Sequence, residues 1–173
     1  SALEARHLPA LVVAPKRVAE NVWQAEAALW RKDLRVAVAA GRPQQRADAL
    51  RSAQLGTADV VVVGRDNLAD AVAHARHYRT FVMDELSSFK NYRSNRWKAA
   101  KAISQLVPHR WGLTGTPSPN GLLDLWAQLY LLDGGERLYN GITKFRQRYF
   151  YPADRLPNGV VTKWEIRPGA DKR

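Results

Sequence analysis

Two adjacent carboxylates at the end of an apolar run are the residues of this chain best suited to chemistry. Residues 81–85 read Phe-Val-Met-Asp-Glu, so Asp84 and Glu85 follow a predicted buried strand. A carboxylate at a strand end can hold Mg²⁺ through water, and its neighbour can orient or deprotonate an attacking water. An acidic turn exposed to solvent would have the same sequence, so the pair alone leaves both interpretations open.

A second polar motif, Thr114-Gly115-Thr116-Pro117, follows another short apolar run. Glycine lets a backbone approach a ligand closely, and threonine hydroxyls can donate hydrogen bonds to a carboxylate or a phosphate. The alternative is an ordinary turn from a strand into a helix, capped by Thr116 or Ser118. Taken together, the two motifs favour a nucleotide-hydrolysing site.

The loop that would hold the phosphates of the nucleotide is missing from the sequence. Such a loop has the pattern Gly-x-x-x-x-Gly-Lys-[Ser/Thr], because backbone N–H groups and one lysine must surround the phosphates. None of the 11 glycines is followed by lysine. We therefore expect negligible ATP hydrolysis by this chain alone, and no cofactor bound to it.

The elements that position these motifs alternate between strands and helices. Apolar runs predict strands, and helical spacing and turn residues predict the helices between them. The expected strands are 11–14, 34–39, 60–63, 81–83 and 110–113, and the expected helices are 16–30, 43–55, 67–77, 94–106, one opening at Asn120, and 142–149. This alternation predicts an α/β fold, a parallel sheet flanked by helices. In such sheets ligands bind beyond the carboxyl ends of the strands, where both motifs lie.

Two local details of the helices are also predicted. Val18, Val22, Ala25 and Leu29 are spaced as one apolar face of helix 16–30, which should pack on the sheet. Asp66 is a suitable N-cap for helix 67–77.

Turn residues surround a short β-like run at 160–166, so the segment from about 151 onward is expected to be an appendage.

Composition and charge narrow the class of partner. The net charge of +11 favours a polyanionic partner, above all nucleic acid, over an inert basic surface. The chain has no cysteine, no apolar run near the roughly 20 residues of a membrane span, and no signal peptide at its first residues. We therefore expect an intracellular protein without a membrane partner.

Three strings of residues resemble the Swi/Snf-type DNA translocases, which are helicase-like ATPases of superfamily two. Pro15-Lys16-Arg17-Val18 through Asn21-Val22-Trp23 resembles that family's motif Ia. Asp84 to Asn91 resembles motif II, and Leu113 to Leu122 followed by Leu125-Trp126 resembles motif III. The resemblance covers residues 10–150. Ser87-Ser88-Phe89 departs from the histidine-containing form of motif II.

The resemblance implies a role for each matching residue. Asp84 would serve Mg²⁺ through water, and Glu85 would be the base or the group that orients water. Thr114, Gly115 and Thr116 would link the state of the nucleotide to contact with DNA. The residues implied to lie near nucleic acid are Lys16, Arg17, Pro117 and Asn120, with Lys90 and Asn91 as further candidates.

The resemblance also implies that the chain is one incomplete part of a larger motor. Residues 1–150 would form an incomplete RecA-like lobe, and residues 151–173 would be an irregular or β-like appendage or the start of an insertion. ATP, Mg²⁺ and double-stranded DNA are implied for the intact protein, as are a second RecA-like lobe and a phosphate-loop segment. Without that segment the sheet is expected to lack a central strand, and its exposed edges would need a second copy or another covering contact.

Two interpretations of function stay open. The first is a fragment of a DNA-stimulated translocase that is inactive in isolation, and the second is a non-catalytic module that binds nucleic acid or protein. An RNA helicase of the DEAD-box kind is disfavoured, since its motif III ends Ser-Ala-Thr. A row of basic residues after motif II fits either phosphate contact or a solvated face, and it comprises Arg93, Arg96, Lys98 and Lys101.

The remaining aromatic and histidine signals are weaker. Trp23, Trp126 and Tyr130 fall on apolar helix faces and are expected in the core, whereas Trp97 and Tyr92 are left open. His74 and His77 have the spacing of metal ligands on a helix, but no third ligand is near in sequence. A solvated face is the favoured interpretation.

Overall fold

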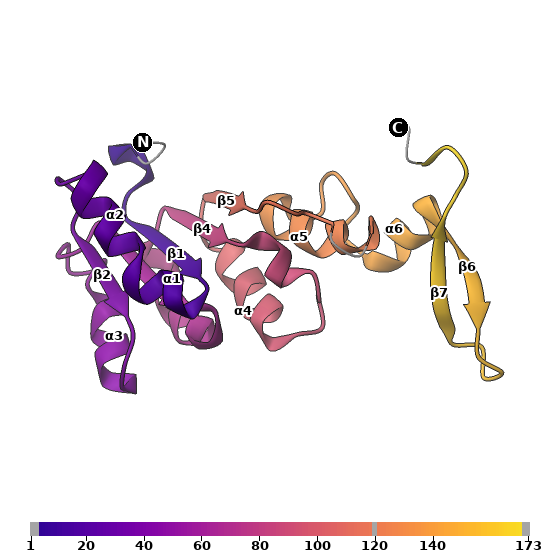
Figure 1. Cartoon of the computed structure of the whole chain (residues 1–173), viewed down its shortest axis with the longest axis horizontal. Coiled ribbons are helices and arrows are strands. Elements are labelled where there is room, and N and C mark those ends of the chain that lie inside the picture. Colours follow the sequence, from indigo (N-terminus) through magenta and orange to yellow (C-terminus); the bar gives the residue numbers. More distant parts are fainter. Residues whose placement is uncertain (1–3, 119–120, 171–173) are drawn as a thin grey trace.

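A five-stranded parallel sheet forms the centre of the structure, a computed structural model that describes residues 4–118 and 121–170. The strand order is β2-β3-β1-β4-β5, and every pairing is parallel (Figure 1). The strands are β1 (Ala10–Ala14), β2 (Val36–Ala39), β3 (Val60–Gly64), β4 (Thr80–Asp84) and β5 (His109–Leu113). The α/β fold predicted from the apolar runs is therefore confirmed.

Helices cover the two faces of the sheet unequally. One face packs against α3 (Pro43–Arg51), the 3₁₀ helix η2 (Arg65–His77), α4 (Asn95–Ser104) and α5 (Leu123–Asp133), and this layer contains most of the core. The other face packs against α1 (Lys16–Asn21) and α2 (Trp23–Trp30), with a smaller apolar cluster. The side chains of β1 and of Val60–Val63 are buried on both faces, as expected for inner parallel strands.

The predicted helix 16–30 and its apolar face need correction. The helix is divided at Val22 into α1 and α2, and no residue of α2 is buried. Val22 is 43% exposed, Leu29 64% and Trp30 74%. Helical spacing shows which side chains share a face, but it cannot show whether another element covers that face. Val18 packs against the smaller apolar cluster, but none of the described elements covers Val22 or Leu29.

The segment predicted as an α-helix at 67–77 is instead a 3₁₀ helix of 13 residues, η2. Asp66 does not cap it: Gly64 lies at the cap position without a side-chain hydrogen bond, and Asp66 forms an ion pair with Arg96 of α4. A 3₁₀ coil places side chains three residues apart above one another. Leu68 and Ala71 are buried in this way against the α4 layer, so tertiary packing overrides the local helical preference.

The expected gap in the centre of the sheet is also wrong. The five strands are continuous, and β1 lies in the middle of the order. The free edges are at the outside: among the described strands, β2 pairs with β3 alone and β5 pairs with β4 alone. Gly112 and Leu113 of β5 are exposed, unlike the residues of the inner strands.

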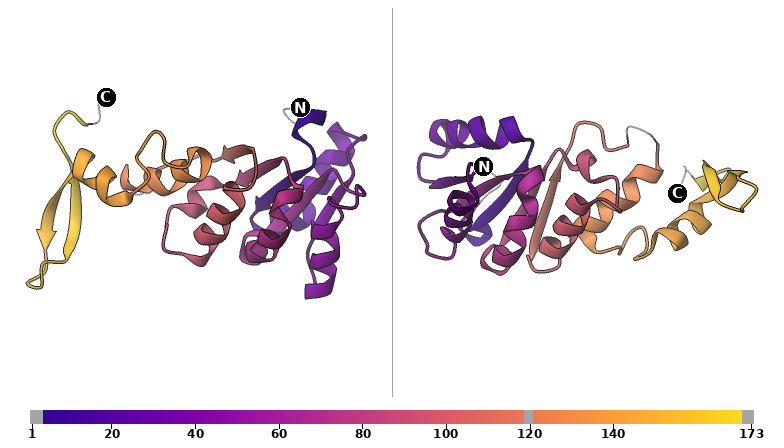
Figure 2. Two further views of the ribbon diagram at one scale, coloured as in Figure 1. Left: turned by 180° about the vertical axis from the view of Figure 1, so that it is seen from behind. Right: turned by 90° about the horizontal axis from the view of Figure 1, so that it is seen from below.

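The C-terminal part of the described chain extends away from the sheet. Helix α6 (Ile142–Tyr149) leads into an antiparallel hairpin of β6 (Phe150–Arg155) and β7 (Val161–Ile166). Figures 1 and 2 show this hairpin at the end of the molecule opposite β2. The β-like run at 160–166 was predicted, but its partner β6 was not. The division into residues 1–150 and 151–173 stays a prediction, and residues 171–173 lie outside the described residues.

Among the described helices, none has the length and apolar character needed to cross a membrane.

Candidate active site

The carboxyl ends of four strands bring the two polar motifs to one edge of the sheet. Ala14 of β1 lies opposite Gly64 of β3, and Asp84 of β4 lies opposite Leu113 of β5. Because β1 also pairs with β4, the segments that leave these four strands begin side by side. Those segments begin with Pro15-Lys16, Arg65, Glu85 and Thr114.

Glu85 is held by two hydroxyl groups directly after β4. Its backbone is left-handed, with φ 58° and ψ 64°, a conformation that is costly for a residue other than glycine. Oε1 accepts hydrogen bonds from the Ser87 hydroxyl and from Thr114 Oγ1, the latter at 2.9 Å. These bonds, Ser87 first and Thr114 second, lower the pKa of Glu85, and the charge of Arg65 adds to them. Glu85 is therefore kept ionised and fixed in direction.

Asp84 is the last residue of β4, and its carboxylate is less engaged. Oδ2 accepts a long hydrogen bond, 3.4 Å, from Nε1 of Trp23 at the start of α2. A carboxylate has about four acceptor sites, so most of this group's capacity is open to water or a cation. Trp23 was predicted in the core. It is half-buried against the smaller apolar cluster and also reaches this edge of the sheet.

The turn after β5 is built around Thr114. The backbone N–H of Thr116 donates to Thr114 Oγ1 at 3.3 Å, and Gln128 of α5 donates to the carbonyl of Pro117. Neither Thr116 nor Ser118 caps α5, because Leu122 lies at its N-cap without a side-chain bond. The alternative of a simple capped turn is therefore wrong.

Packing does not explain the glycine in this turn. A Cβ added at Gly115 would meet no heavy atom within 4 Å among the described residues, and its φ is not positive. The expectation that Gly115 permits close approach of a ligand is thus compatible with the structure and stays a prediction.

The residues predicted to lie near nucleic acid are distributed around the same edge. Lys16 and Arg17 are exposed on the first turn of α1. Lys90 lies 3.8 Å from Asp124 of α5, and Asn91 accepts from the N–H of Arg93 at 3.0 Å. Both therefore have structural partners, and any contact with nucleic acid stays a prediction. Asn120 lies outside the described residues.

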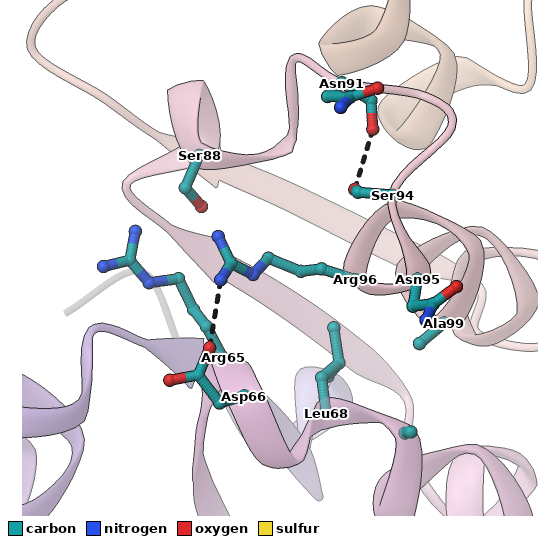
Figure 3. A pocket seen from close by; sticks show the side chains of 10 residues that line it. Arg65, Asp66, Leu68, Ser88, Asn91, Ser94, Asn95, Arg96 and Ala99 are labelled. Atoms are coloured by element: carbon teal, nitrogen blue, oxygen red, sulfur yellow. Dashed lines mark hydrogen bonds and ion pairs between the residues drawn. The ribbon is translucent and has the colours of Figure 1, made fainter.

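Sequence reasoning missed two contributors to this site. Ser87 was seen as a departure from motif II, yet its hydroxyl helps to hold Glu85. Arg65 was not singled out. The available signal was its position directly after Gly64, at the end of a predicted strand. Its charge acts on Glu85 from the neighbouring segment, and Figure 3 shows it in the wall of an adjacent pocket.

This geometry agrees with comparisons to known proteins. The profile of the SNF2-related domain matches residues 3–164, nearly the whole chain. The chain belongs to the SNF2-related domain family. The structure titled Sulfolobus solfataricus SWI2/SNF2 ATPase core in complex with dsDNA matches this SNF2-related chain with a TM-score of 0.69 and 26% identity, over 84% of this chain and 29% of that one. The sheet and its helices thus match a RecA-like lobe of that core, and the predicted resemblance is confirmed.

Several curated proteins are similar in sequence. Protein p41 of Acyrthosiphon pisum secondary endosymbiont phage 1 is 38% identical over 82% of this SNF2-related chain and 32% of its own length. The TATA-binding protein-associated factor MOT1 of Saccharomyces cerevisiae is 34% identical over 96% of the chain and 9% of its own length. Helicase SWR1 of Kluyveromyces lactis is 30% identical over 86% of the chain and 10% of its own length. The chain therefore spans about a third of the phage relative and about a tenth of the yeast ones.

At this edge of the SNF2-related sheet no group of three or more metal-ligating side chains lies together among the described residues, so the magnesium site stays a prediction. Asp84 offers a partly open carboxylate, the kind of ligand that Mg²⁺ accepts directly or through water. The phosphates of a nucleotide would need a glycine-rich loop with its lysine, and the 173 residues contain no Gly-Lys pair.

Proposed function

We propose that the chain is part of a DNA-dependent ATPase of the SNF2 type, which translocates on duplex DNA in its intact form. The observation that carries this proposal is the hydrogen bond from Thr114 to Glu85, because it joins the acidic motif to the turn after the next strand. Family membership, the net charge of +11 and a structural neighbour titled as a complex with dsDNA support it.

In this proposal the two carboxylates have different tasks. Asp84 would hold Mg²⁺ through water, and the metal would neutralise charge on the nucleotide. Glu85, ionised and fixed by its two hydroxyl partners, would orient the attacking water and accept its proton. Thr114, Gly115 and Thr116 would make the position of Glu85 depend on the turn that ends at Pro117. A shift of this turn when DNA binds would thereby change the hydrogen bond that holds Glu85.

We further propose that this chain does not hydrolyse ATP by itself. A phosphate loop and a second RecA-like lobe would have to come from outside these 173 residues. Duplex DNA would contact Lys16, Arg17 and Pro117, where exposed cations and a backbone turn lie along the same edge. Lys90, Asn91 and Asn120 complete the proposed contact set.

The test measures phosphate release from ATP by the intact protein and by this chain, each with and without duplex DNA. We expect DNA-stimulated release by the intact protein, reduced at least about 100-fold by Glu85→Gln, since the orienting base is lost. An exposed cation at the far end of the sheet, changed in Lys32→Gln, provides the control. DNA-stimulated turnover by this chain alone that Glu85→Gln abolishes would contradict the proposed inactivity.

A second candidate function is a non-catalytic module that binds nucleic acid or a protein partner. The absence of any Gly-Lys pair from the sequence favours it. Duplex binding by the intact protein without hydrolysis, unchanged by Glu85→Gln, would select this function over the first.

A further inference from the structure

A cavity of about 490 Å³ opens beside the acidic site, between η2, η3 (Leu86–Phe89) and α4 (Figure 3). Leu68, Ala69 and Ala99 give it an apolar part. Its remaining wall is polar and carries two guanidinium groups, and it consists of Arg65, Asp66, Ser88, Asn91, Ser94, Asn95 and Arg96. Of the residues that η2 and α4 contribute to this wall, Arg65 also acts on the acidic site, through its charge on Glu85.

Two buried polar groups at this cavity lack a partner within the described part of the chain. They are Oγ of Ser88 and Nε of Arg96. Leaving a buried donor unsatisfied costs free energy, so such groups in a folded protein call for an explanation. Both groups can donate a hydrogen bond, and a ligand that satisfies them must therefore be an acceptor.

The charge of the cavity indicates an anionic acceptor. Figure 3 shows the guanidinium groups of Arg65 and Arg96 and the hydroxyl of Ser88 directed toward the same space from three different elements. Asp66 pairs with Nη2 of Arg96 at 3.0 Å, but its side chain is 78% exposed, so the pair is screened by solvent. In each of the two arginines the remaining N–H donors form a planar fork. This fork matches the spacing of two oxygens of a phosphate.

Other polar side chains in the wall contribute less. Oδ1 of Asn91 already accepts from the N–H of Arg93, and the Ser94 hydroxyl donates to the carbonyl of Asn91. These bonds shape the turn into α4. The three donors that converge on open space are therefore those of Arg65, Ser88 and Arg96.

We propose that this cavity is a binding site for a phosphate group, held by Arg65 and Arg96 and by the hydroxyl of Ser88. The phosphate is either a phosphodiester of a duplex backbone or free inorganic phosphate, since both present the same acceptor oxygens. The site lies beside the acid pair and does not require that the chain hydrolyse ATP. The proposal assigns a function to Arg96, one of the basic residues after motif II whose role the sequence analysis left open.

The first experiment uses NMR of this chain at low salt, with resonances of the Arg96 Nε–H and the Ser88 amide followed during titration with inorganic phosphate and, separately, with a short DNA duplex. Arg96→Gln removes the fork, and Arg93→Gln is the matched control, because Arg93 precedes the same helix, is exposed and lies over the ring of Tyr92. We expect Arg96→Gln to weaken binding at least about tenfold and Arg93→Gln to change it less than about twofold.

Ser88→Ala separates a binding role from a structural one. Because the hydroxyl is buried without a partner, its removal is expected to leave the melting temperature unchanged or raised, while phosphate binding weakens. A hydroxyl needed for folding would give the opposite result, a lower melting temperature.

The two titrations also distinguish the source of the phosphate. Saturable shifts with inorganic phosphate alone, displaced by sulfate, identify the free ion. Shifts with the duplex that inorganic phosphate does not displace identify the backbone, and then Arg96→Gln lowers the slope of log affinity against log salt by about 0.9. The proposal is overturned if neither ligand moves these resonances, or if Arg93→Gln and Arg96→Gln weaken binding equally. No hydrolysis is measured, so failure here is independent of the proposed ATPase function.

Discussion

Oγ1 of Thr114 donates a hydrogen bond of 2.9 Å to Oε1 of Glu85, and this bond joins the segments that leave two neighbouring strands. The same carboxylate oxygen accepts from Ser87, and the same threonine oxygen accepts from the N–H of Thr116. Glu85 is therefore the meeting point of a short chain of hydrogen bonds that ends in the turn after β5. A change in that turn must alter the environment of the carboxylate.

Thr114→Val removes the hydroxyl but keeps the shape of the side chain. We expect the pKa of Glu85 to rise toward its ordinary value, because one hydrogen bond that favours the charged form is lost. DNA-stimulated hydrolysis by the intact protein should fall about tenfold, the effect of roughly 1.4 kcal/mol. NMR titration of the carboxyl carbon measures the pKa, with Thr116→Val as the control. An unchanged titration curve would show that the bond does not act on the carboxylate.

Ser87→Ala should change stability in a way that depends on pH. The bond from Ser87 is the leading cause of the lowered pKa of Glu85, so it stabilises the fold while the carboxylate is charged. Its contribution is present above the ordinary pKa of 4.5 and is lost as pH falls through the lower pKa of the folded state. We expect the variant to melt at a lower temperature at neutral pH, and the difference to shrink as the pH falls below 4.5 and Glu85 becomes protonated. The neighbouring Ser88→Ala, which has no bond to Glu85, should show no such dependence on pH.

Two glycine substitutions near β5 should have opposite consequences. Gly115→Ala is expected to change the free energy of unfolding by less than about 0.5 kcal/mol, since its Cβ has open space, but to impair DNA-stimulated hydrolysis. Gly112→Ala would place Cβ 2.5 Å from Cδ2 of the buried Leu86 and should cost about 1–3 kcal/mol. Denaturant unfolding and a hydrolysis assay of the intact protein measure both. Full activity of a stable Gly115→Ala protein would remove the case for close approach of a ligand.

A buried and an exposed tryptophan should differ in their contribution to stability. Trp97 is 5% exposed, packs on Trp126 and Tyr130, and donates to the carbonyl of Ala127 at 2.8 Å. Trp97→Ala should therefore lower the free energy of unfolding by about 3–5 kcal/mol. Trp30→Ala should change it by less than about 0.5 kcal/mol in urea titrations, because this side chain is mostly in solvent. Comparable losses in the two variants would mean that Trp30 is covered in solution.

Contacts between α1 and a duplex are tested by salt dependence. If Lys16 and Arg17 each neutralise one phosphate, replacing both with alanine lowers the slope of log affinity against log salt by about 1.8. Fluorescence anisotropy of a labelled duplex at several salt concentrations gives this slope. Lys32→Ala, an exposed cation before β2 at the opposite end of the sheet, should leave the slope unchanged. An equal drop in Lys32→Ala would indicate diffuse attraction rather than contact at α1.

The strands were predictable because their sequences are buried on both faces. A run such as Val60–Val63 has no polar position, and only an inner strand of a covered parallel sheet buries all four side chains. The meeting of the two polar motifs was predictable for a related reason: parallel strands all present their carboxyl ends at one edge. The positions of Asp84 and Thr114 in sequence were therefore enough to bring them together.

Other features depend on contacts between distant residues, which no local pattern contains. The 3₁₀ form of η2 follows from its packing on α4, and the exposure of Leu29 follows from the lack of a described neighbour over α2. Trp97 was left open, yet it is buried by residues of α5 about thirty positions later in the sequence. The bond from Ser87 to Glu85 required the left-handed backbone of Glu85, which the sequence did not indicate.

The free edge of β5 has a consequence for how the protein behaves in a concentrated solution. A strand edge with unpaired N–H and C=O groups is adhesive toward another copy of itself, whereas a net charge of +11 makes the copies repel. Salt screens the repulsion over about 8 Å at physiological ionic strength, but it does not weaken hydrogen bonds between strands to the same extent. Raising the salt concentration, which strips polyanions from a basic protein, also removes the barrier to self-association. The purified chain should therefore self-associate more readily as the ionic strength rises.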